Sequence, residues 1–411
     1  MTSSLLGATG SSSIGRREFV FLMAMIQALQ SLGFTTLLPA IGHIATDLGS
    51  DQPNERQWII GIFLISSGLF SLVPGTLSDR FGRKPVLLFS MGAFAVINLL
   101  CALVTDFVVL LTARALLGMA SCALTVLPLA IIRDRYQGDD MAKLQAFVAT
   151  VFIAVPTLAP SLGFAILELA GWRAIFVVIG ALTLIMMIWY HLRMGETLSP
   201  ANRINRSSKD LVNNIRLVLG NRDAIGYILG MALVFGAHFG FITSSQQLIG
   251  ESFGAGKAFP LIFGLMAGSM MVASLVNSAI VERFGTRRVG HTAMILYVIV
   301  SLLQVYFAWW HDETLIEFVL LMSANMCLLI TIFINFTAIA LQPFGKFAGA
   351  ASSVHTFFRL VVGAGLGALI GQVYDGTSLP LAYSLLAVGL LTFVLVLYSE
   401  RGRLFRRFAR T

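Results

Sequence analysis

Residues 75–84 read GTLSDRFGRK, and this stretch decides the fold because the chain repeats it. Residues 278–287, which lie 203 positions later, read SAIVERFGTR, so an acid, an arginine, a phenylalanine and a glycine recur in the same order. Both copies lie between long apolar segments. A loop signature shared by two halves of a chain is typical of a duplicated helical unit, and duplicated halves that handle a substrate at their interface are typical of transporters.

The composition excludes several classes of protein before any other motif is considered. Of the 411 residues, 57% are hydrophobic and only 12% are charged, whereas soluble domains are about 25% charged. The chain therefore has too few polar side chains to cover a water-exposed surface. We expect an integral membrane protein whose main partner is the lipid bilayer, and we exclude a soluble domain, a disordered chain and a nucleic-acid-binding module.

Twelve apolar stretches are long enough to cross a bilayer, which needs about 20 residues per helix. Their runs are continuous rather than alternating, which favours helices over barrel strands. We therefore predict an all-α integral membrane protein with twelve transmembrane helices in two pseudo-symmetric six-helix bundles. The predicted spans are 19–41, 57–77, 85–105, 107–131, 143–167, 172–193, 223–249, 259–281, 291–310, 315–341, 348–371 and 380–399.

The longest polar stretch divides the spans into six and six. We predict a tail at 1–18, a first bundle at 19–193, a linker at 194–222, a second bundle at 223–399 and a tail at 400–411. With the N-terminus inside, cytoplasmic segments hold 23 of the 28 Lys and Arg residues, the opposite side holds three, and two lie within helices. Positive charge collects in cytoplasmic loops, so both termini are expected in the cytoplasm.

Three motifs carry a resemblance to a known family. Residues 75–84 resemble the loop 2–3 signature of the major facilitator superfamily, Arg114-Ala-Leu-Leu-Gly118 resembles the helix 4 signature of its proton-coupled members, and residues 156–163, PTLAPSLG, resemble the helix 5 antiporter motif. A finer resemblance is to the bicyclomycin-resistance type of drug:proton antiporters. It is carried by LPAI at 38–41, AIIRDRY at 130–136, GWRAIF at 171–176, SLVN at 274–277 and AGAAS at 348–352.

This resemblance implies a transporter rather than an enzyme. It implies a monomeric carrier of the bacterial inner membrane that exports small molecules, such as drugs, in exchange for protons and needs no cofactor or metal. The chain departs from the subfamily at three places. Thr35 replaces an acid expected in helix 1, Ser245-Gln246 replaces a Ser-Pro pair expected late in helix 7, and Arg359 replaces a glutamine expected in helix 11. The proton site and the substrate range therefore stay open.

The repeated loop and the helix 5 motif suggest moving parts. We interpret Asp79, Arg80, Gly82, Arg83 and Lys84 as gating residues, because a carboxylate at a helix end can pair with arginines or with a neighbouring helix N-terminus. The alternative is that these cations only set the topology. Two helix 5 prolines remove backbone donors, and a glycine permits close helix approach. This motif, formed by Pro156, Pro160 and Gly163, indicates either a bending helix or an ordinary kinked one.

The acids and bases are unevenly distributed through the predicted membrane. All 20 acids fall in loops or near helix ends, whereas Arg114, His238, His355 and Arg359 lie deep inside spans. A charge at mid-bilayer costs at least ~2.5–3.5 kcal/mol and is usually paired or functional. We therefore predict a cavity that favours anionic, zwitterionic or neutral polar substrates, with protons carried by histidines or by the substrate. The alternatives are a structural anchor for Arg114 and packing roles for the histidines.

Polar residues within the spans are further candidates to line the substrate path. They are Gln30, Thr35, Gln246 and Asn325, each of which could equally bridge two helices. Two other functions remain open. One is an uptake carrier or facilitator for organic anions on the same fold, and the other is a membrane receptor that does not transport. The chain has no Gly-x-x-x-x-Gly-Lys-Ser/Thr loop, which excludes direct drive by ATP on this chain.

Overall fold

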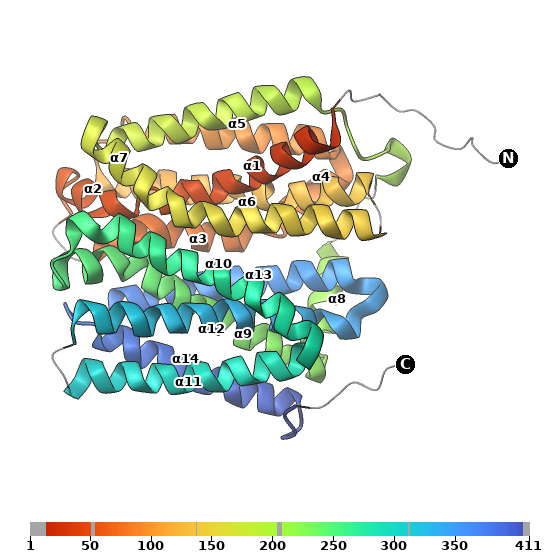
Figure 1. Cartoon of the computed structure of the whole chain (residues 1–411). Helices are drawn as coiled ribbons and strands as arrows, with labels where there is room; N and C mark the ends of the chain where they lie inside the picture. The colour runs from red at the N-terminus through yellow and green to blue at the C-terminus, as the bar shows by residue number, and fades with distance from the viewer. Residues whose placement is uncertain (1–13, 51–53, 137, 204–207, 311–312, 406–411) are drawn as a thin grey trace.

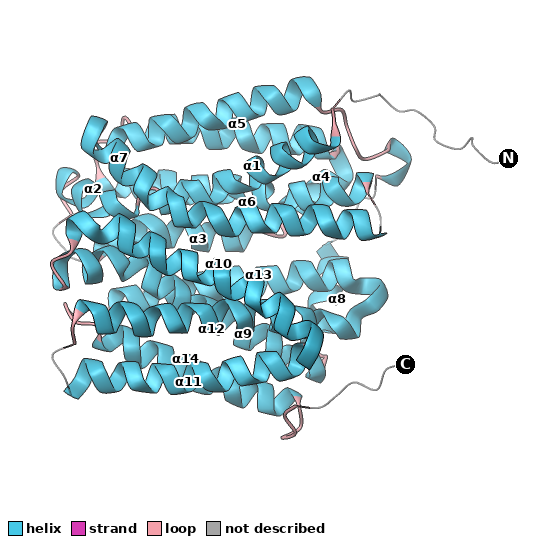
Figure 2. Cartoon of the chain, in the orientation of Figure 1, coloured by secondary structure: helices cyan, strands magenta, loops and turns pink. Residues whose placement is uncertain are grey.

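A computed structural model describes residues 14–50, 54–136, 138–203, 208–310 and 313–405. These ranges contain helices and loops and no strand, as Figure 2 shows. The helices of the first half are α1 (Arg16–Thr35), α2 (Ile41–Asp47), α3 (Trp58–Phe70), α4 (Val73–Phe81), α5 (Arg83–Cys101), α6 (Phe107–Arg135) and α7 (Gly138–Arg193). Those that follow are α8 (Ser208–Leu219), α9 (Arg222–Ser245), α10 (Phe259–Phe284), α11 (Thr286–Trp310), α12 (Leu315–Leu341), α13 (Ala348–Gln372) and α14 (Leu379–Ser399).

Helix α7 is one continuous element of 56 residues that contains a reversal. Gly171 interrupts it with a left-handed backbone, φ +77°. Arg16 pairs with Asp140 and Glu18 pairs with Arg193, so both ends of α7 lie beside the start of α1. The residues before and after Gly171 therefore form two limbs that cross the molecule in opposite directions (Figure 1).

The prediction of an all-α membrane protein is confirmed, but the count of twelve spans is not reproduced directly. Ten helices in the described residues are long and apolar enough to cross a bilayer, or eleven if α3 and α4, which bend by 48°, form one span. The difference arises in α7, because the predicted spans 143–167 and 172–193 lie in this single element. Twelve crossings follow when the two limbs of α7 are taken separately.

The helices form two groups that lie side by side in Figure 1, α1 to α7 in one and α9 to α14 in the other. The groups meet where α3 packs on α13 and where α7 packs on α10. Small residues permit these contacts. A Cβ on Gly68 of α3 would lie 2.9 Å from the backbone of Leu360, and one on Gly264 of α10 would lie 3.3 Å from the Thr157 carbonyl oxygen.

Large apolar side chains cover the outside of the molecule, as a lipid environment requires. Phe89 is 79% exposed, Leu169 is 87% exposed and Trp310 is 78% exposed. Soluble monomers rarely expose apolar surface on this scale. Helix α1 begins and α14 ends at the same end of the molecule (Figure 1). We call this end the termini end and the opposite one the far end.

Candidate functional site

The repeated segment at residues 75–84, predicted as a loop, lies at the termini end, where it forms the end of α4, the break at Gly82 and the start of α5. Gly82 separates the two helices with φ +104° and ψ 157°, a conformation that residues with a side chain rarely adopt. A Cβ on Gly82 would also overlap the carboxylate of Glu196. Glycine is therefore required here both by the backbone and by the space around it.

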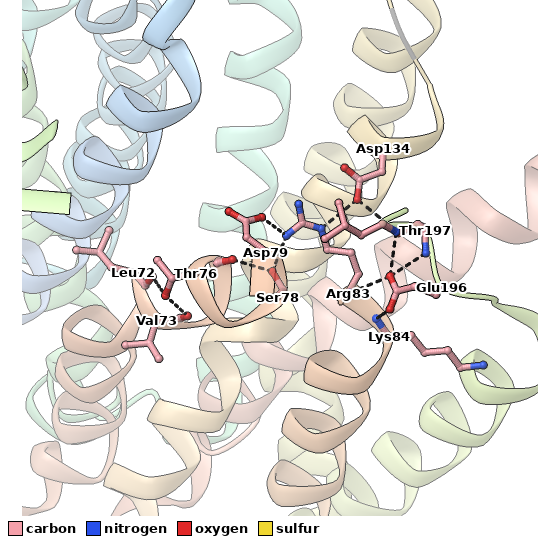
Figure 3. A network of polar contacts seen from close by, with 12 residues as sticks. Leu72, Val73, Thr76, Ser78, Asp79, Arg83, Lys84, Asp134, Glu196 and Thr197 are labelled. Carbon is pink, nitrogen blue, oxygen red and sulfur yellow. Dashed lines mark hydrogen bonds and ion pairs between the residues drawn. The ribbon is translucent and has the colours of Figure 1, made fainter. Parts of the chain in front are cut away.

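Arg83 is the centre of an ionic cluster beside this glycine (Figure 3). Its side chain is only 5% exposed and lies between two carboxylates, with Nη1 2.6 Å from Asp79 and Nε 3.0 Å from Asp134 at the end of α6. Nη1 also donates to the Ser78 hydroxyl at 2.6 Å. Two acids and a hydroxyl thus compensate a buried guanidinium, which is the condition for holding such a charge away from water.

Glu196, just after α7, fastens the same loop from the other side. Its carboxylate accepts hydrogen bonds from the backbone N–H groups of Arg83 at 2.9 Å and Lys84 at 3.1 Å. A carboxylate at a helix N-terminus satisfies free amides and complements the helix dipole. The Lys84 ammonium donates to the His191 carbonyl at 2.9 Å. The Arg80 guanidinium lies 5.1 Å from the centre of the Phe81 ring.

At the far end, six hydrogen bonds join the two halves. We call this set the far-end seal. The guanidinium of Arg56 makes a bidentate pair with Glu251, at 2.7 and 2.6 Å. The other four bonds are Gln57 Nε2 to Gln247 Oε1 at 2.5 Å, Asn54 Nδ2 to the carbonyls of Gln372 and Tyr374 at 3.0 and 2.9 Å, and Gln372 Nε2 to the Asn54 carbonyl at 2.9 Å.

The far-end seal includes a tyrosine that stays neutral. Tyr374 contacts the Ser252 hydroxyl at 2.5 Å and donates to the Gln247 carbonyl at 3.4 Å. Burial raises the pKa of the Tyr374 hydroxyl, because the charged form loses solvation. Each seal contact beyond the single ion pair is therefore made by a neutral group.

Arg114 is fully buried in the first half, at a site separate from the ionic cluster. Its Nε donates to the Ile59 carbonyl and its Nη1 to the Gly33 carbonyl, each at 2.8 Å. The guanidinium also lies 4.5 Å from the centre of the Phe63 ring. These contacts join α6 to α1 and α3. The geometry therefore favours the alternative role for Arg114, that of a structural anchor between helices.

The predicted lining residues lie in helix packing in this conformation, with one exception. Thr35 is fully buried and donates to the Ser31 carbonyl at 2.7 Å. Gln30 donates to Ser67 at 2.8 Å and accepts from Thr125. Two further candidates lie in the second half. Asn325 donates to Gln304 at 2.8 Å inside the bundle, whereas Gln246 is half-buried in the π-helical turn Gln246–Ser252, which leads into the far-end seal.

Arg359 and His355 lie one turn apart on α13 in the second half. The Arg359 guanidinium lies 4.9 Å from the ring centre of Phe235 on α9 and 5.3 Å from that of Phe333 on α12. His355 is 4% exposed. Buried nitrogens of Arg359, His355 and His238, namely Nε, Nε2 and Nδ1, have no hydrogen-bond partner among the described residues. The Tyr297 hydroxyl, on α11, is also buried without a partner among the described residues, but Arg359, His355 and His238 lie on neighbouring helices α13 and α9.

The helix 5 motif falls in the first limb of α7. The side chain of Pro156 lies outside the described residues, whereas Pro160 is buried. Gly163 lies against α1's end, where a Cβ would overlap the Thr36 carbonyl oxygen. Close packing of α7 on the end of α1 therefore depends on this glycine, as the sequence pattern predicts.

A second buried polar cluster lies at the termini end of the second half. Tyr227 donates to Glu400 at 2.5 Å, and Glu400 pairs with Arg287 at 2.7 Å. The backbone N–H of Phe405 donates to Nδ1 of His291 at 3.1 Å, so the other ring nitrogen holds the proton and donates to Tyr227 at 2.7 Å. This cluster therefore holds the segment from Glu400 to Phe405 against the second half.

Sequence reasoning missed several of these residues. Asp134, Glu196 and Glu400 are acids at helix ends, and each pairs with a loop cation or caps a loop helix. The sequence held one weak indication of the far-end seal, because Arg56 is one of only three Lys and Arg residues on the side opposite the termini. The members of the far-end seal come from distant parts of the chain, so no local motif marks them.

Together, two packed helical groups, an apolar outer surface and a polar seal between the groups define a multi-pass membrane protein with the architecture of a transporter. The chain belongs to the Major Facilitator Superfamily, whose family model matches residues 23–368. Proteins of this kind sit in a lipid bilayer and bind small-molecule substrates.

Individual relatives agree with this assignment. The chain is 28% identical over 378 residues to the uncharacterized MFS-type transporter YdgK of Bacillus subtilis (strain 168), covering 89% of this chain and 91% of that one. It is 26% identical over 375 residues to a bicyclomycin resistance protein homolog of Haemophilus influenzae, covering 89% and 92%. Its fold is similar to a bacterial homologue of the human lysosomal transporter Spinster, with a TM-score of 0.70, 14% identity and coverage of 94% and 96%.

Proposed function

We propose that this protein exports small molecules across a bacterial inner membrane by alternating access, in exchange for protons. The bicyclomycin resistance relative supports drug or xenobiotic efflux. The uneven distribution of Lys and Arg supports a cytoplasmic position for both termini. The basic groups deep in the second half support a preference for anionic, zwitterionic or neutral polar substrates over lipophilic cations.

The far-end seal is the observation that carries this proposal. If the termini are cytoplasmic, the far end is periplasmic, and the bonds from Arg56, Gln57 and Asn54 to the second half close that side. Alternating access requires such contacts to form in one state and to break in the other. The molecule is then in a state that is closed toward the periplasm.

The residues of loop 75–84 are proposed as the gate at the cytoplasmic end. In this state Arg83 is held by Asp79 and Asp134 of its own half. A change of these partners as the halves rock would provide the switch. Cations that only set topology need no burial between carboxylates, so the 5% exposure of the Arg83 side chain supports a gating role.

Proton coupling is proposed to involve the second half. Thr35 is hydrogen-bonded to its own helix, at the position where related antiporters carry an acid, and Arg114 is held by two carbonyls. His238 and His355 have unsatisfied ring nitrogens and are the remaining titratable candidates, unless the substrate itself carries the proton. Pro160 and Gly163 are proposed to let α7 bend against α1 during the change.

Transport into vesicles of known orientation tests the proposal. Proteoliposomes with an imposed pH gradient would be given an anionic probe, carboxyfluorescein, and a cationic one, ethidium. We expect accumulation driven by the gradient, in the direction of export, that a protonophore abolishes, and we expect carboxyfluorescein to be preferred. Gradient-independent movement, or movement only in the direction of uptake, would instead support the alternative, an organic-anion carrier or facilitator.

A matched pair of variants tests the far-end seal. Arg56→Gln removes an ion pair between the halves, whereas Arg173→Gln removes an ion pair to Asp47 within one half, and both pairs measure 2.6 Å. We expect Arg56→Gln to increase labelling of a cysteine placed at Leu248, which is buried beside the seal and makes none of its bonds, by a reagent applied from the far end. Arg173→Gln should leave labelling unchanged, and equal labelling in both variants would contradict the seal.

A further inference from the structure

The second half contains a guanidinium with little compensation. The side chain of Arg359 is partly buried, its Nε is inaccessible to solvent, and Nε has no hydrogen-bond partner among the described residues. Its recorded contacts are the faces of Phe235 and Phe333, at 4.9 and 5.3 Å. Within the described part of the chain no carboxylate pairs with it. Aromatic faces attract a cation but accept no conventional hydrogen bond.

Two histidines on the helices around this guanidinium also have a buried nitrogen without a hydrogen-bond partner among the described residues. His355 lies one helical turn from Arg359 on α13, is 4% exposed, and leaves Nε2 unbonded. His238 lies on α9, three residues after Phe235, and leaves Nδ1 unbonded. Buried polar atoms in folded proteins are almost always satisfied, so a set of unsatisfied nitrogens on packed helices needs an explanation.

Arg114 shows what a structural buried arginine looks like in this protein. It is fully buried in its own half, and although its Nη2 has no hydrogen-bond partner among the described residues, its Nε and Nη1 each donate to a carbonyl at 2.8 Å. The guanidinium of Arg359 lies over the ring of Phe235, as that of Arg114 lies over the ring of Phe63, but Arg359 has no carbonyl partner among the described residues. The difference is therefore in the hydrogen bonds and not in the aromatic contact.

We propose that Arg359 and His355 form a receptor for the oxyanion group of an aromatic organic anion, such as a carboxylate or a sulfonate. The anion supplies the counter-charge and the acceptors that the protein omits, because a guanidinium presents its N–H donors in a fork that fits two oxyanion oxygens. Phe235 and Phe333 hold the guanidinium plane and provide apolar surface for the ring of the ligand. This inference rests on the proposed transport function for the idea that the anion is the cargo.

The stability of the empty protein provides a test that needs no ligand. Arg359→Met removes an uncompensated charge and should raise the melting temperature of the purified protein by a few degrees. The matched variant Arg114→Met removes two satisfied hydrogen bonds and should lower it. A fall for Arg359→Met as large as that for Arg114→Met would show that Arg359 is structural and would overturn the proposal.

Ligand binding provides the second test, with three probes of one shape and different charge: benzoate, benzamide and benzylammonium. Benzoate should raise the melting temperature of the wild type and of Arg216→Gln, which removes an exposed cation of α8. The shift should vanish in Arg359→Met, and Arg359→Lys should weaken benzoate about tenfold because it keeps the charge without the fork. Equal shifts with all three probes, no shift with benzoate, or a benzoate shift that survives in Arg359→Met would overturn the proposal.

The two proposals fail in different ways. If benzoate stabilises the wild type through Arg359 but no substrate crosses proteoliposomes, the receptor stands and the transport function falls. If Arg359→Met exports carboxyfluorescein at the wild-type rate, the receptor falls and the transport function stands.

Discussion

In the first copy of the repeated loop Gly82 joins α4 to α5 with φ +104°, and in the second copy Gly285 joins α10 to α11 with φ +84°. Each copy also stacks an arginine on the next residue, with 5.1 Å between Arg80 and the Phe81 ring and 5.4 Å between Arg283 and the Phe284 ring. The acid-Arg-Phe-Gly pattern therefore encodes one turn, used twice.

The partners of the following cation differ between the copies. Arg83 lies between Asp79, inside its own loop, and Asp134, while Glu196 of the segment that leaves the first half caps the next helix. Arg287 instead pairs with Glu400 at the end of the chain. The first loop is thus tied to the segment that leads to the second half, and the second loop is tied to the C-terminal segment. We infer that the first loop serves movement and the second serves stability.

The largest expected difference concerns the two cations that follow the repeated glycines, Arg83 and Arg287. Arg83→Met removes the counter-charge of two carboxylates that are 16% and 14% exposed, and it should destabilise the protein by roughly 3 kcal/mol. Arg287→Met leaves one carboxylate that still accepts from Tyr227, so a smaller loss is expected. Unfolding in denaturant would measure both losses, and transport per folded molecule should fall only for Arg83→Met. A larger loss for Arg287→Met would reverse our ranking.

The two glycines of the repeated turn, Gly82 and Gly285, should show an effect of intermediate size when they are replaced. An alanine at either position adopts a left-handed backbone, which costs about 1–2 kcal/mol. A Cβ at Gly285 meets nothing within 4 Å, whereas one at Gly82 overlaps Glu196. Gly82→Ala should therefore lower the melting temperature more than Gly285→Ala and should also reduce transport. Equal melting temperatures would mean that Glu196 moves aside without cost.

The smallest expected effect on stability concerns the two loop acids. Asp79→Asn keeps the shape of the side chain but removes the charge that faces Arg83, so we expect near-normal abundance and about a tenfold loss of transport. Glu282 is exposed, so Glu282→Gln should change stability by no more than about 0.5 kcal/mol and leave transport unchanged. Normal transport by Asp79→Asn at normal abundance would remove this residue from the gate.

Much of the fold could be predicted because the membrane imposes simple rules. The apolar length of each segment predicted the helices, and the repeated loop predicted two related halves. The spans 143–167 and 172–193 were separated correctly in sequence, since Gly171 gives the reversal its left-handed backbone. The structure describes both as α7 because the reversal occupies a single residue of irregular backbone.

The site was less predictable, since a helical sequence does not show which way a side chain faces. Thr35 and Asn325 are polar residues in spans, but both bond within the packed bundle. Asp134 and Glu251 find their partners 51 and 195 residues away, and packing of the whole fold sets such distances. Arg359 could be proposed as a site residue because an ionisable group deep in a membrane span is rare enough to stand out in the sequence alone.

The far-end seal has a consequence for how voltage and acidity act on this protein. Four of its six bonds involve amides, which do not titrate, and the remaining two belong to one ion pair with no net charge. The pair places one charge on each half, so voltage can act on the seal only through the displacements of Arg56 and Glu251, at up to about 2.3 kcal/mol per charge for each 100 mV. The four amide bonds carry no charge, so neither voltage nor acidity acts on them directly, and within the far-end seal a gradient can act only on the Arg56–Glu251 pair.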